Sequence, residues 1–342
     1  MKSERWEGPV LYVVVPCFDE EAVLDDTAEE LDRTLEAMAG EGLIGEESRI
    51  LFVDDGSTDR TWEKVRVLSA LRPRIGGIAL RPHGGHQTAM YTGLMESRAY
   101  CDAAVTMDAD LQDDPAILPA MVEQFLAGKD VVYARRKSRR GDPLWKRATA
   151  WLFYRSMPAM KIHMPKDCGE YRLLSKRALE GLALFTEPDP FLRGLIPLLG
   201  LPSGEVPFDR RPRRAGKSRY PFRKAAGLAA GAVVSLSPWP IHLLFWLGIG
   251  IALPALLRLI WLLAFSSRVS GLPGTSPALG PGPSGPFPGW ETATVSIWAA
   301  TGLLLMGMGI LGAYILRIWR QVAGRPQGQV TEKVNVGRGT GN

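Results

Sequence analysis

Short apolar runs recur along the N-terminal part of the chain, and they constrain its fold more than any other feature. Each run is predominantly apolar from end to end, as strands buried on both faces of a sheet are. The predicted strands are residues 10–15, 50–53, 75–80, 103–107 and 131–134.

Apolar residues at helical spacing lie between these runs. One face of the first predicted helix carries Leu24, Ala28, Leu31, Leu35 and Met38, and Gly40 closes that helix. Further helices are predicted through 62–68, after His86, and over 116–126 behind Pro115. Repeated strand–helix units of this kind predict an α/β domain with a mainly parallel sheet, whose ligands bind at the carboxyl ends of the strands.

Three of the predicted strands end in loops rich in carboxylates, at residues 16–21, 54–59 and 108–113. In the last of these loops, Asp108 and Asp110 are spaced so that an extended turn aims both side chains at one point. Hard divalent cations such as Mg²⁺ or Mn²⁺ take oxygen ligands and often share them with phosphate. The pair therefore indicates a metal-bound diphosphate, although an Asp-x-Asp taken alone also fits an acidic surface turn.

Taken together, the loops resemble family 2 glycosyltransferases. The matching motifs are Pro-Cys-Phe-Asp-Glu from Pro16, Val-Asp-Asp-Gly-Ser-Thr-Asp from Val53 and Asp-Ala-Asp-Leu-Gln-Asp from Asp108. The segments at 131–136 and 167–173 narrow the resemblance to polyprenyl-phosphate glycosyltransferases, the group of bactoprenol glucosyltransferases and dolichyl-phosphate mannose synthases. The resemblance runs from about Val10 to Pro326 and implies a GT-A-like nucleotide-sugar-binding domain.

The resemblance also implies roles for individual residues. The nucleotide sugar would contact Pro16, Phe18, Glu20, Val53, Asp55, Asp108, Ala109 and Gln112. Asp108 and Asp110 would hold the metal, Mg²⁺ or Mn²⁺. Phosphates of the donor or the lipid acceptor would contact Arg135, Arg147, Arg213, Ser218 and Arg219. Asp167 or Glu170 would orient the sugar or assist as a base, and a salt bridge to a neighbouring arginine is the alternative for both.

Three features depart from the common pattern of that group. Phe18 stands where tyrosine is usual, so a hydroxyl is lost. The loop at 81–86 lacks the usual lysine, and either His83 or His86 compensates or both are surface histidines in a glycine turn. In the element Gly-Lys-Ser-Arg-Tyr, Arg219 replaces the usual lysine and keeps the charge.

The C-terminal third has a different character. Residues 241–265 and 292–316 are long enough and apolar enough to cross a bilayer as two helices. Basic residues before the first and after the second place both ends in the cytoplasm by the positive-inside rule. The predicted organisation begins with a cytoplasmic catalytic domain at 1–221 and an interfacial helix at 222–240. The two membrane spans follow, separated by an external Pro/Gly-rich loop at 266–291, and the chain ends in a cytoplasmic tail at 317–342. The expected location is therefore the plasma (inner) membrane. Gly309 and Ala313 form a small-xxx-small pair compatible with packing between copies in a homo-oligomer.

The net charge of +5 is concentrated in two basic patches, at residues 135–147 and 209–224. Such patches suit phosphate groups and anionic membrane lipids. No nucleic-acid-binding motif accompanies them, so nucleic acid is not an expected partner. The three cysteines are few, scattered and without metal spacing, which is typical of free thiols in a reducing compartment.

The expected reaction is an inverting transfer of a sugar to the phosphate of a membrane polyprenyl phosphate. By resemblance the donor is UDP-glucose first and GDP-mannose second. One alternative is a processive polysaccharide synthase, but the sequence lacks the Gln-x-x-Arg-Trp element of such enzymes. The other alternative is a non-catalytic membrane scaffold or flippase subunit, against which the intact Asp-x-Asp argues.

Overall fold

The computed structural model describes residues 8–137, 168–185, 190–209, 211, 246–250, 253, 257, 290–323 and 328–337. The chain divides into two compact units, the first made of Met1–Ala232 with Gly324–Asn342 and the second of Val233–Ala323. Some of the predicted features lie outside the described residues: Arg147, Asp167, Arg213, Ser218, Arg219, the interfacial helix at 222–240 and all but the last two residues of the loop at 266–291. Those two residues, 290 and 291, are helical.

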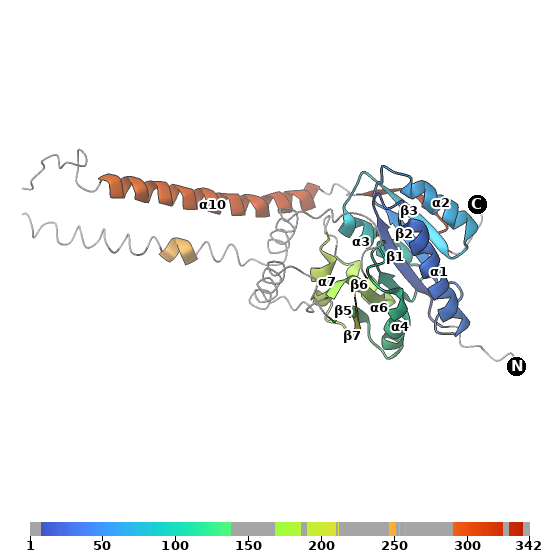
Figure 1. Cartoon of the computed structure of the whole chain (residues 1–342). Helices are drawn as coiled ribbons and strands as arrows, with labels where there is room; N and C mark the ends of the chain where they lie inside the picture. The colour runs from blue at the N-terminus through green and yellow to red at the C-terminus, as the bar shows by residue number, and fades with distance from the viewer. Residues whose placement is uncertain are drawn as a thin grey trace, which may run out of the picture. The chain divides into compact units, whose positions relative to one another are not determined.

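The first unit is built on one eight-stranded sheet with the order β7-β5-β6-β4-β1-β2-β3-β8 (Figure 1). Its strands are β1 (Leu11–Cys17), β2 (Arg49–Asp54), β3 (Ile75–Arg81), β4 (Ala103–Thr106), β5 (Val131–Arg136), β6 (Cys168–Ser175), β7 (Ser203–Phe208) and β8 (Gln329–Val334). The helices of this unit are α1 (Leu24–Gly40), α2 (Thr61–Leu71), α3 (His86–Ser97), the 3₁₀ turn η1 (Pro115–Ile117), α4 (Leu118–Leu126), α6 (Lys176–Leu182) and α7 (Leu192–Leu198).

Helices cover both faces of the sheet because successive strand residues point to opposite faces. Leu11, Val13 and Val15 of β1 enter a core with α1, α2 and α4, whereas Tyr12 and Val14 enter a second core with α3, α6 and α7. This double burial explains why the strand sequences are apolar throughout. The predicted α/β class is confirmed, with each predicted strand and helix of the N-terminal part found within a few residues of its expected bounds.

The sheet is mainly parallel, as predicted, at the strands that carry the acidic loops. β1 pairs in parallel with β2 and with β4, and β2 pairs in parallel with β3. The strands β6, β7 and β8 were not predicted. Strand β6 is antiparallel to both β4 and β5, β7 is parallel to β5, and β8 is antiparallel to β3. The carboxyl ends of β1, β2 and β4 therefore meet at one edge of the sheet.

The second unit contains helix α10 (Trp290–Ala323), which includes the whole of the second predicted span. Within the first predicted span, the described residues 246–250, 253 and 257 are helical. A search confined to the described part of the chain found no helix that combines the length and the apolar character needed to cross a membrane. The two spans stay a prediction.

Candidate active site

At the carboxyl edge of β1, β2 and β4, hydrogen bonds join the loops after β1 and β2 and tie the loop after β4 to helix α1. The backbone N–H of Asp55 donates to the carbonyl of Cys17 at 2.9 Å, which ties the end of β2 to the end of β1. Thr58 donates its backbone N–H to Asp19 Oδ1 at 2.8 Å. The hydroxyl of Thr27, in α1, donates to the carbonyl of Ala109 at 2.7 Å. The predicted clustering of the acidic loops is therefore confirmed.

Asp55 lies at the centre of the contacts made by the loop at 81–86. The side chain is 2% exposed. Its Oδ1 accepts the backbone N–H of Gly84 at 2.8 Å, and its Oδ2 lies 2.9 Å from His83 Nδ1. Burial raises the pKa of this carboxyl, and the Gly84 N–H and His83 oppose that rise. The carboxylate is thus oriented by its neighbours rather than solvated.

His83 also packs on Phe18, with ring centroids 4.6 Å apart and the rings tilted by 38°. The sequence left open whether the two histidines are surface residues or members of the site. His83 contacts two residues that the resemblance assigns to the nucleotide, Phe18 and Asp55, so it belongs to the site. An aromatic pair beside a buried carboxylate suits a flat ring that carries N–H donors.

Of the other residues expected at the nucleotide, Pro16 and Val53 lie in strands, and Glu20 lies in the loop after β1. Pro16 and Val53 are register partners in adjacent parallel strands, and Val53 is fully buried. The backbone N–H of Glu20 donates to the Thr61 hydroxyl at 2.9 Å, which fixes the start of the loop at 16–21.

Asp54 was not predicted as a site residue, yet its side chain is fully buried beside Asp55. Its Oδ1 accepts the backbone N–H of Ser57 at 3.3 Å, and its Oδ2 lies 3.3 Å from Arg81 Nη1. The acid fastens the loop after β2 and anchors the start of the loop at 81–86. The sequence signal was its position as the last residue of a buried strand, where an unpaired carboxylate is costly.

The Asp-x-Asp loop places its two acids in different surroundings. The Asp108 side chain is 31% exposed, and His86 Nε2 lies 3.5 Å from its Oδ1. Asp110 is 8% exposed, and its Oδ1 accepts the backbone N–H of Gln112 at 3.1 Å. The residue between Asp110 and Gln112, Leu111, has a φ of 53°, a conformation rare outside glycine. The contact with Asp108 places His86, like His83 beside Asp55, next to a candidate site residue.

The donor set of this loop fits a hard divalent cation, because Asp108 and Asp110 supply carboxylate oxygens at the end of a buried strand. Among the described residues, no group of three or more His, Cys, Asp or Glu side chains has the arrangement of a metal site. A cation here would be held by Asp108 and Asp110.

Glu170 lies in β6 between two guanidinium groups. Arg172, which is 1% exposed at its side chain, forms an ion pair with it, and Arg193 Nη2 lies 2.8 Å from Glu170 Oε1. Burial favours a raised pKa, but Arg172 and Arg193 outweigh it and hold the pKa of Glu170 at about 2. Of the two readings that the sequence allowed, the salt bridge is the one found. A carboxylate with this pKa is a poor general base at neutral pH.

Arg135 lies near the end of β5, where its Nε is 2.8 Å from Glu205 Oε2 of β7. Both side chains are about half exposed, at 49% and 47%. Such an exposed pair is weak, so it leaves the guanidinium available to exchange its partner for a phosphate.

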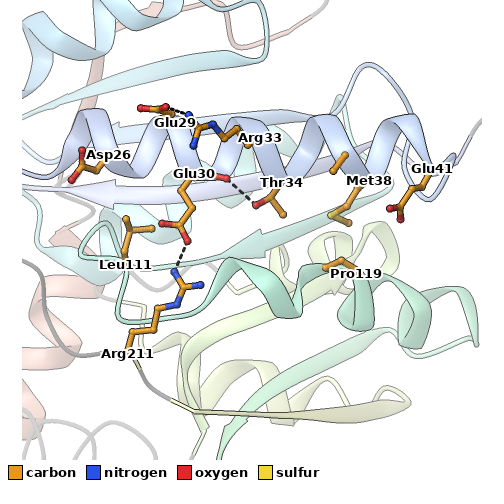
Figure 2. Close-up of a pocket in the computed structure, with 11 residues that line it drawn as sticks. Asp26, Glu29, Glu30, Arg33, Thr34, Met38, Glu41, Leu111, Pro119 and Arg211 are labelled. Atoms are coloured by element: carbon orange, nitrogen blue, oxygen red, sulfur yellow. Dashed lines mark hydrogen bonds and ion pairs between the residues drawn. The ribbon is translucent and has the colours of Figure 1, made fainter.

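Arg211 connects three parts of the fold and was not predicted. Its guanidinium bridges Glu30 of α1 and Asp114, with Nη2 2.7 Å from Asp114 Oδ1. Its backbone N–H donates to the carbonyl of Gln112 at 3.0 Å. Figure 2 shows this arginine reaching Glu30 near Leu111, at the edge of a groove of about 840 Å³ over α1. The lining of that groove contains none of Asp55, Asp108 and Asp110, but it includes Leu111 of the Asp-x-Asp loop.

The family model and the relatives that match this chain agree on one family of proteins. The family model described as Glycosyl transferase family 2 matches residues 12–182. An uncharacterized glycosyltransferase, YkoT, of Bacillus subtilis is 38% identical over 93% of this chain and 90% of its own length. A prophage-derived bactoprenol glucosyl transferase of Shigella flexneri is 31% identical over 82% of this chain and 86% of its own. Glucosyl-3-phosphoglycerate synthase of Mycobacterium tuberculosis, solved with Mn²⁺, UDP and phosphoglyceric acid, is a more distant likeness. It has 18% identity and a TM-score of 0.45 over 67% of this chain and 78% of that one.

Proposed function

Because the chain belongs to glycosyl transferase family 2, we propose that this glycosyltransferase moves a sugar from a nucleotide sugar to the phosphate of a membrane polyprenyl phosphate. The observation that carries the proposal is the meeting of Phe18, Asp55 and the Asp-x-Asp loop at one sheet edge. Several relatives that match most of the chain are named bactoprenol glucosyl transferases, which supports a lipid-phosphate acceptor. UDP-glucose is the proposed donor, and GDP-mannose is the second candidate.

The donor would lie across the edge of the sheet. Its base would pack beside Phe18 and His83, where Asp55 can accept a hydrogen bond from a ring N–H. The diphosphate would extend toward Asp108 and Asp110, beside His86 at the start of α3. The backbone N–H groups at the start of a helix favour an anion, which supports that direction.

Asp108 and Asp110 would hold Mg²⁺ or Mn²⁺. When bound, the cation supplies positive charge that neutralises the leaving diphosphate. The exposure of Asp108 suits a ligand that binds together with its substrate, and the hydrogen bond from Gln112 orients Asp110.

The acceptor phosphate needs positioning more than deprotonation. A phosphate monoester is already anionic at neutral pH, with a second pKa of about 6. Catalysis then consists of aligning the phosphate oxygen for attack at the anomeric carbon, and a single displacement inverts that carbon. The low pKa of Glu170 is consistent with a mechanism that requires no strong base. Arg135, with Arg147, Arg213, Ser218 and Arg219, is proposed for the phosphates.

The membrane assignment forms part of the proposal. Large apolar side chains of α10 are exposed, among them Leu304 at 68% and Ile315 at 66%, as a helix in contact with lipid requires. Residues 241–265 and 292–316 would span the plasma (inner) membrane, with residues 222–240 at its surface and the catalytic domain in the cytoplasm. The basic patch at 209–224 would lie where lipid phosphates are found.

A panel of radiolabelled nucleotide sugars, incubated with polyprenyl phosphate and the full-length protein in membranes, tests the donor and the acceptor together. We expect label to enter the lipid fraction with a UDP- or GDP-sugar and only when a divalent cation is present. Asp110→Asn should abolish that transfer, because it removes one ligand charge and several kcal/mol of transition-state stabilisation. Asp25→Asn, on the exposed side of α1, is the control and should leave the rate unchanged. Transfer by Asp110→Asn within about threefold of the parent rate would contradict the metal role.

A further inference from the structure

Strand β8 follows the second unit in the chain and is fastened along the edge strand β3. The two strands are antiparallel, from Gly77 opposite Val334 to Arg81 opposite Gln329. Beyond β8, the Asn335 amide donates to the carbonyls of Pro73 at 2.9 Å and Ile75 at 2.8 Å. Strand β8 and the residue after it are thus fixed to both ends of β3, including the end that leads into the loop at 81–86.

Gly328, immediately before β8, packs against Gly84 of that loop. A Cβ added to Gly84 would lie 3.1 Å from Gly328 Cα. A Cβ added to Gly328 would lie 3.3 Å from Leu80 Cδ1, 3.4 Å from Thr88 Cγ2 and 3.6 Å from Gly84 Cα. Gly328 also has a φ of +66°, which favours glycine. A Cβ on Gly84 would therefore press on the Gly328 backbone, whereas a Cβ on Gly328 would make an ordinary contact with Gly84 and a tighter one with the Leu80 side chain.

The same loop holds the carboxylate at the centre of the site. Gly84 donates its backbone N–H to Asp55 Oδ1 at 2.8 Å, and the preceding residue, His83, contacts both Asp55 and Phe18. A shift of Gly84 away from Asp55 would break that hydrogen bond and move the imidazole. Gly328 is thus one contact from the residue that orients Asp55.

We propose that Gly328 is a positioning residue of the donor site, through which the seating of β8 on β3 sets the place of the 81–86 loop. This inference rests on the proposed function, since it takes the pocket around Asp55 to bind the nucleotide. Donor affinity then depends on a residue more than 240 positions away in the chain from Gly84, and acceptor affinity does not.

The test compares Gly328→Ala with Gly200→Ala in the full-length protein. Gly200 has a φ of +63°, close to that of Gly328, and none of the described atoms lies within 4 Å of a Cβ added there. The two variants carry similar backbone strain, but only Gly328→Ala places a methyl group against Leu80, Thr88 and Gly84. We expect Gly328→Ala to raise the KM for the nucleotide sugar and the Kd for UDP or GDP roughly tenfold. The KM for polyprenyl phosphate should stay within about twofold, and Gly200→Ala should leave all three constants within about twofold.

Thr331→Val keeps the test decisive if Gly328→Ala does not fold. The Thr331 hydroxyl donates to the carbonyl of Ala79 at 3.2 Å, beside the irregularity in the β3–β8 pairing. Its removal should raise the donor KM about threefold and leave the acceptor KM unchanged.

Donor constants for Gly328→Ala equal to those for Gly200→Ala would overturn the inference, as would an unchanged donor KM in Thr331→Val. If the wild-type protein binds neither UDP nor GDP, the proposed function itself fails and the inference fails with it. A wild-type protein that binds a nucleotide, with a Gly328→Ala variant that does not differ from its control, refutes the inference alone.

Discussion

At the scale of single residues, Glu170 is a candidate catalytic acid whose carboxylate forms structural ion pairs. Its carboxylate is shared between Arg172, which is almost fully buried, and Arg193. A buried guanidinium without a counter-ion is strongly unfavourable, so the carboxylate is needed for folding whether or not a substrate is present. The segment at 167–173 carries two acids, and it is the ion pairs with Arg172 and Arg193 that assign a structural role to Glu170.

Glu170→Gln should therefore lower stability more than it lowers turnover. A pKa held at about 2, against 4.5 for a free carboxyl, corresponds to roughly 3 kcal/mol of stability at neutral pH. Because the folded pKa lies below the unfolded one, that contribution is complete above about pH 5 and is lost as the pH falls toward 2. The Tm of the variant should lie below that of the wild type by a constant amount above about pH 5. The two Tm values should converge as the pH falls toward 2. Glu46→Gln, whose exposed carboxylate pairs with Arg74, is the control and should change Tm little. A Glu170→Gln variant with wild-type Tm and no turnover would show that this carboxylate acts in the reaction.

At the scale of elements, the loop after β4 depends on support from a distant segment. Leu111 adopts a positive φ between Asp110 and Gln112, and such a residue persists only where its surroundings fix it. Arg211 provides that support through Asp114 and through the Gln112 carbonyl. The segment that leaves β7, at the start of the basic patch at 209–224, thereby touches the Asp-x-Asp loop.

Arg211→Ala should reduce activity more than stability. Its ion pairs are partly exposed, so their loss costs about 1 kcal/mol or less. Displacement of the Asp-x-Asp loop should lower kcat/KM for the nucleotide sugar roughly tenfold. Arg177→Ala is the control, because it removes an ion pair with Asp130 that does not involve the Asp-x-Asp loop. Its kcat/KM should stay within about twofold of the wild type. Equal kcat/KM values for the two variants would mean that Arg211 does not support the loop.

The sequence predicted the parallel strands well because burial on both faces leaves continuous apolar runs, as in Val13-Val14-Val15 of β1. Besides β6, it did not predict β7, which buries only Val206 and Phe208, or β8, in which exposed and partly buried residues alternate. These strands lie at the two edges of the sheet, where pairing with a neighbour decides the structure more than local sequence does. The acidic loops were located by motif, whereas His83, Asp54 and Arg211 required the packing of segments distant in sequence.

At the scale of the whole molecule, the chain leaves the catalytic unit after Ala232 and returns to it at Gly324. The C-terminal segment is bound to this unit, because β8 pairs with β3 and the Tyr12 hydroxyl donates to the Val336 carbonyl at 3.0 Å. A segment whose two flanks belong to one folded unit crosses a membrane an even number of times if it crosses at all. This connectivity supports a hairpin of two spans and disfavours one span or three.

The proposed topology predicts that the loop at 266–291 is reached only from outside the cell. A cysteine introduced as Ser276→Cys, in a background without the three native cysteines, should react with a membrane-impermeant maleimide added to intact cells. Glu46→Cys in the same background is the matched control, because Glu46 is exposed on the catalytic unit and should react only after permeabilisation. The physical reason is the positive-inside bias, with eight basic residues at 209–224 before the first span and Arg317 and Arg320 after the second. If both cysteines are labelled only after permeabilisation, the two-span hairpin is wrong. If Glu46→Cys alone is labelled in intact cells, the orientation is reversed, and the donor would have to be supplied from outside.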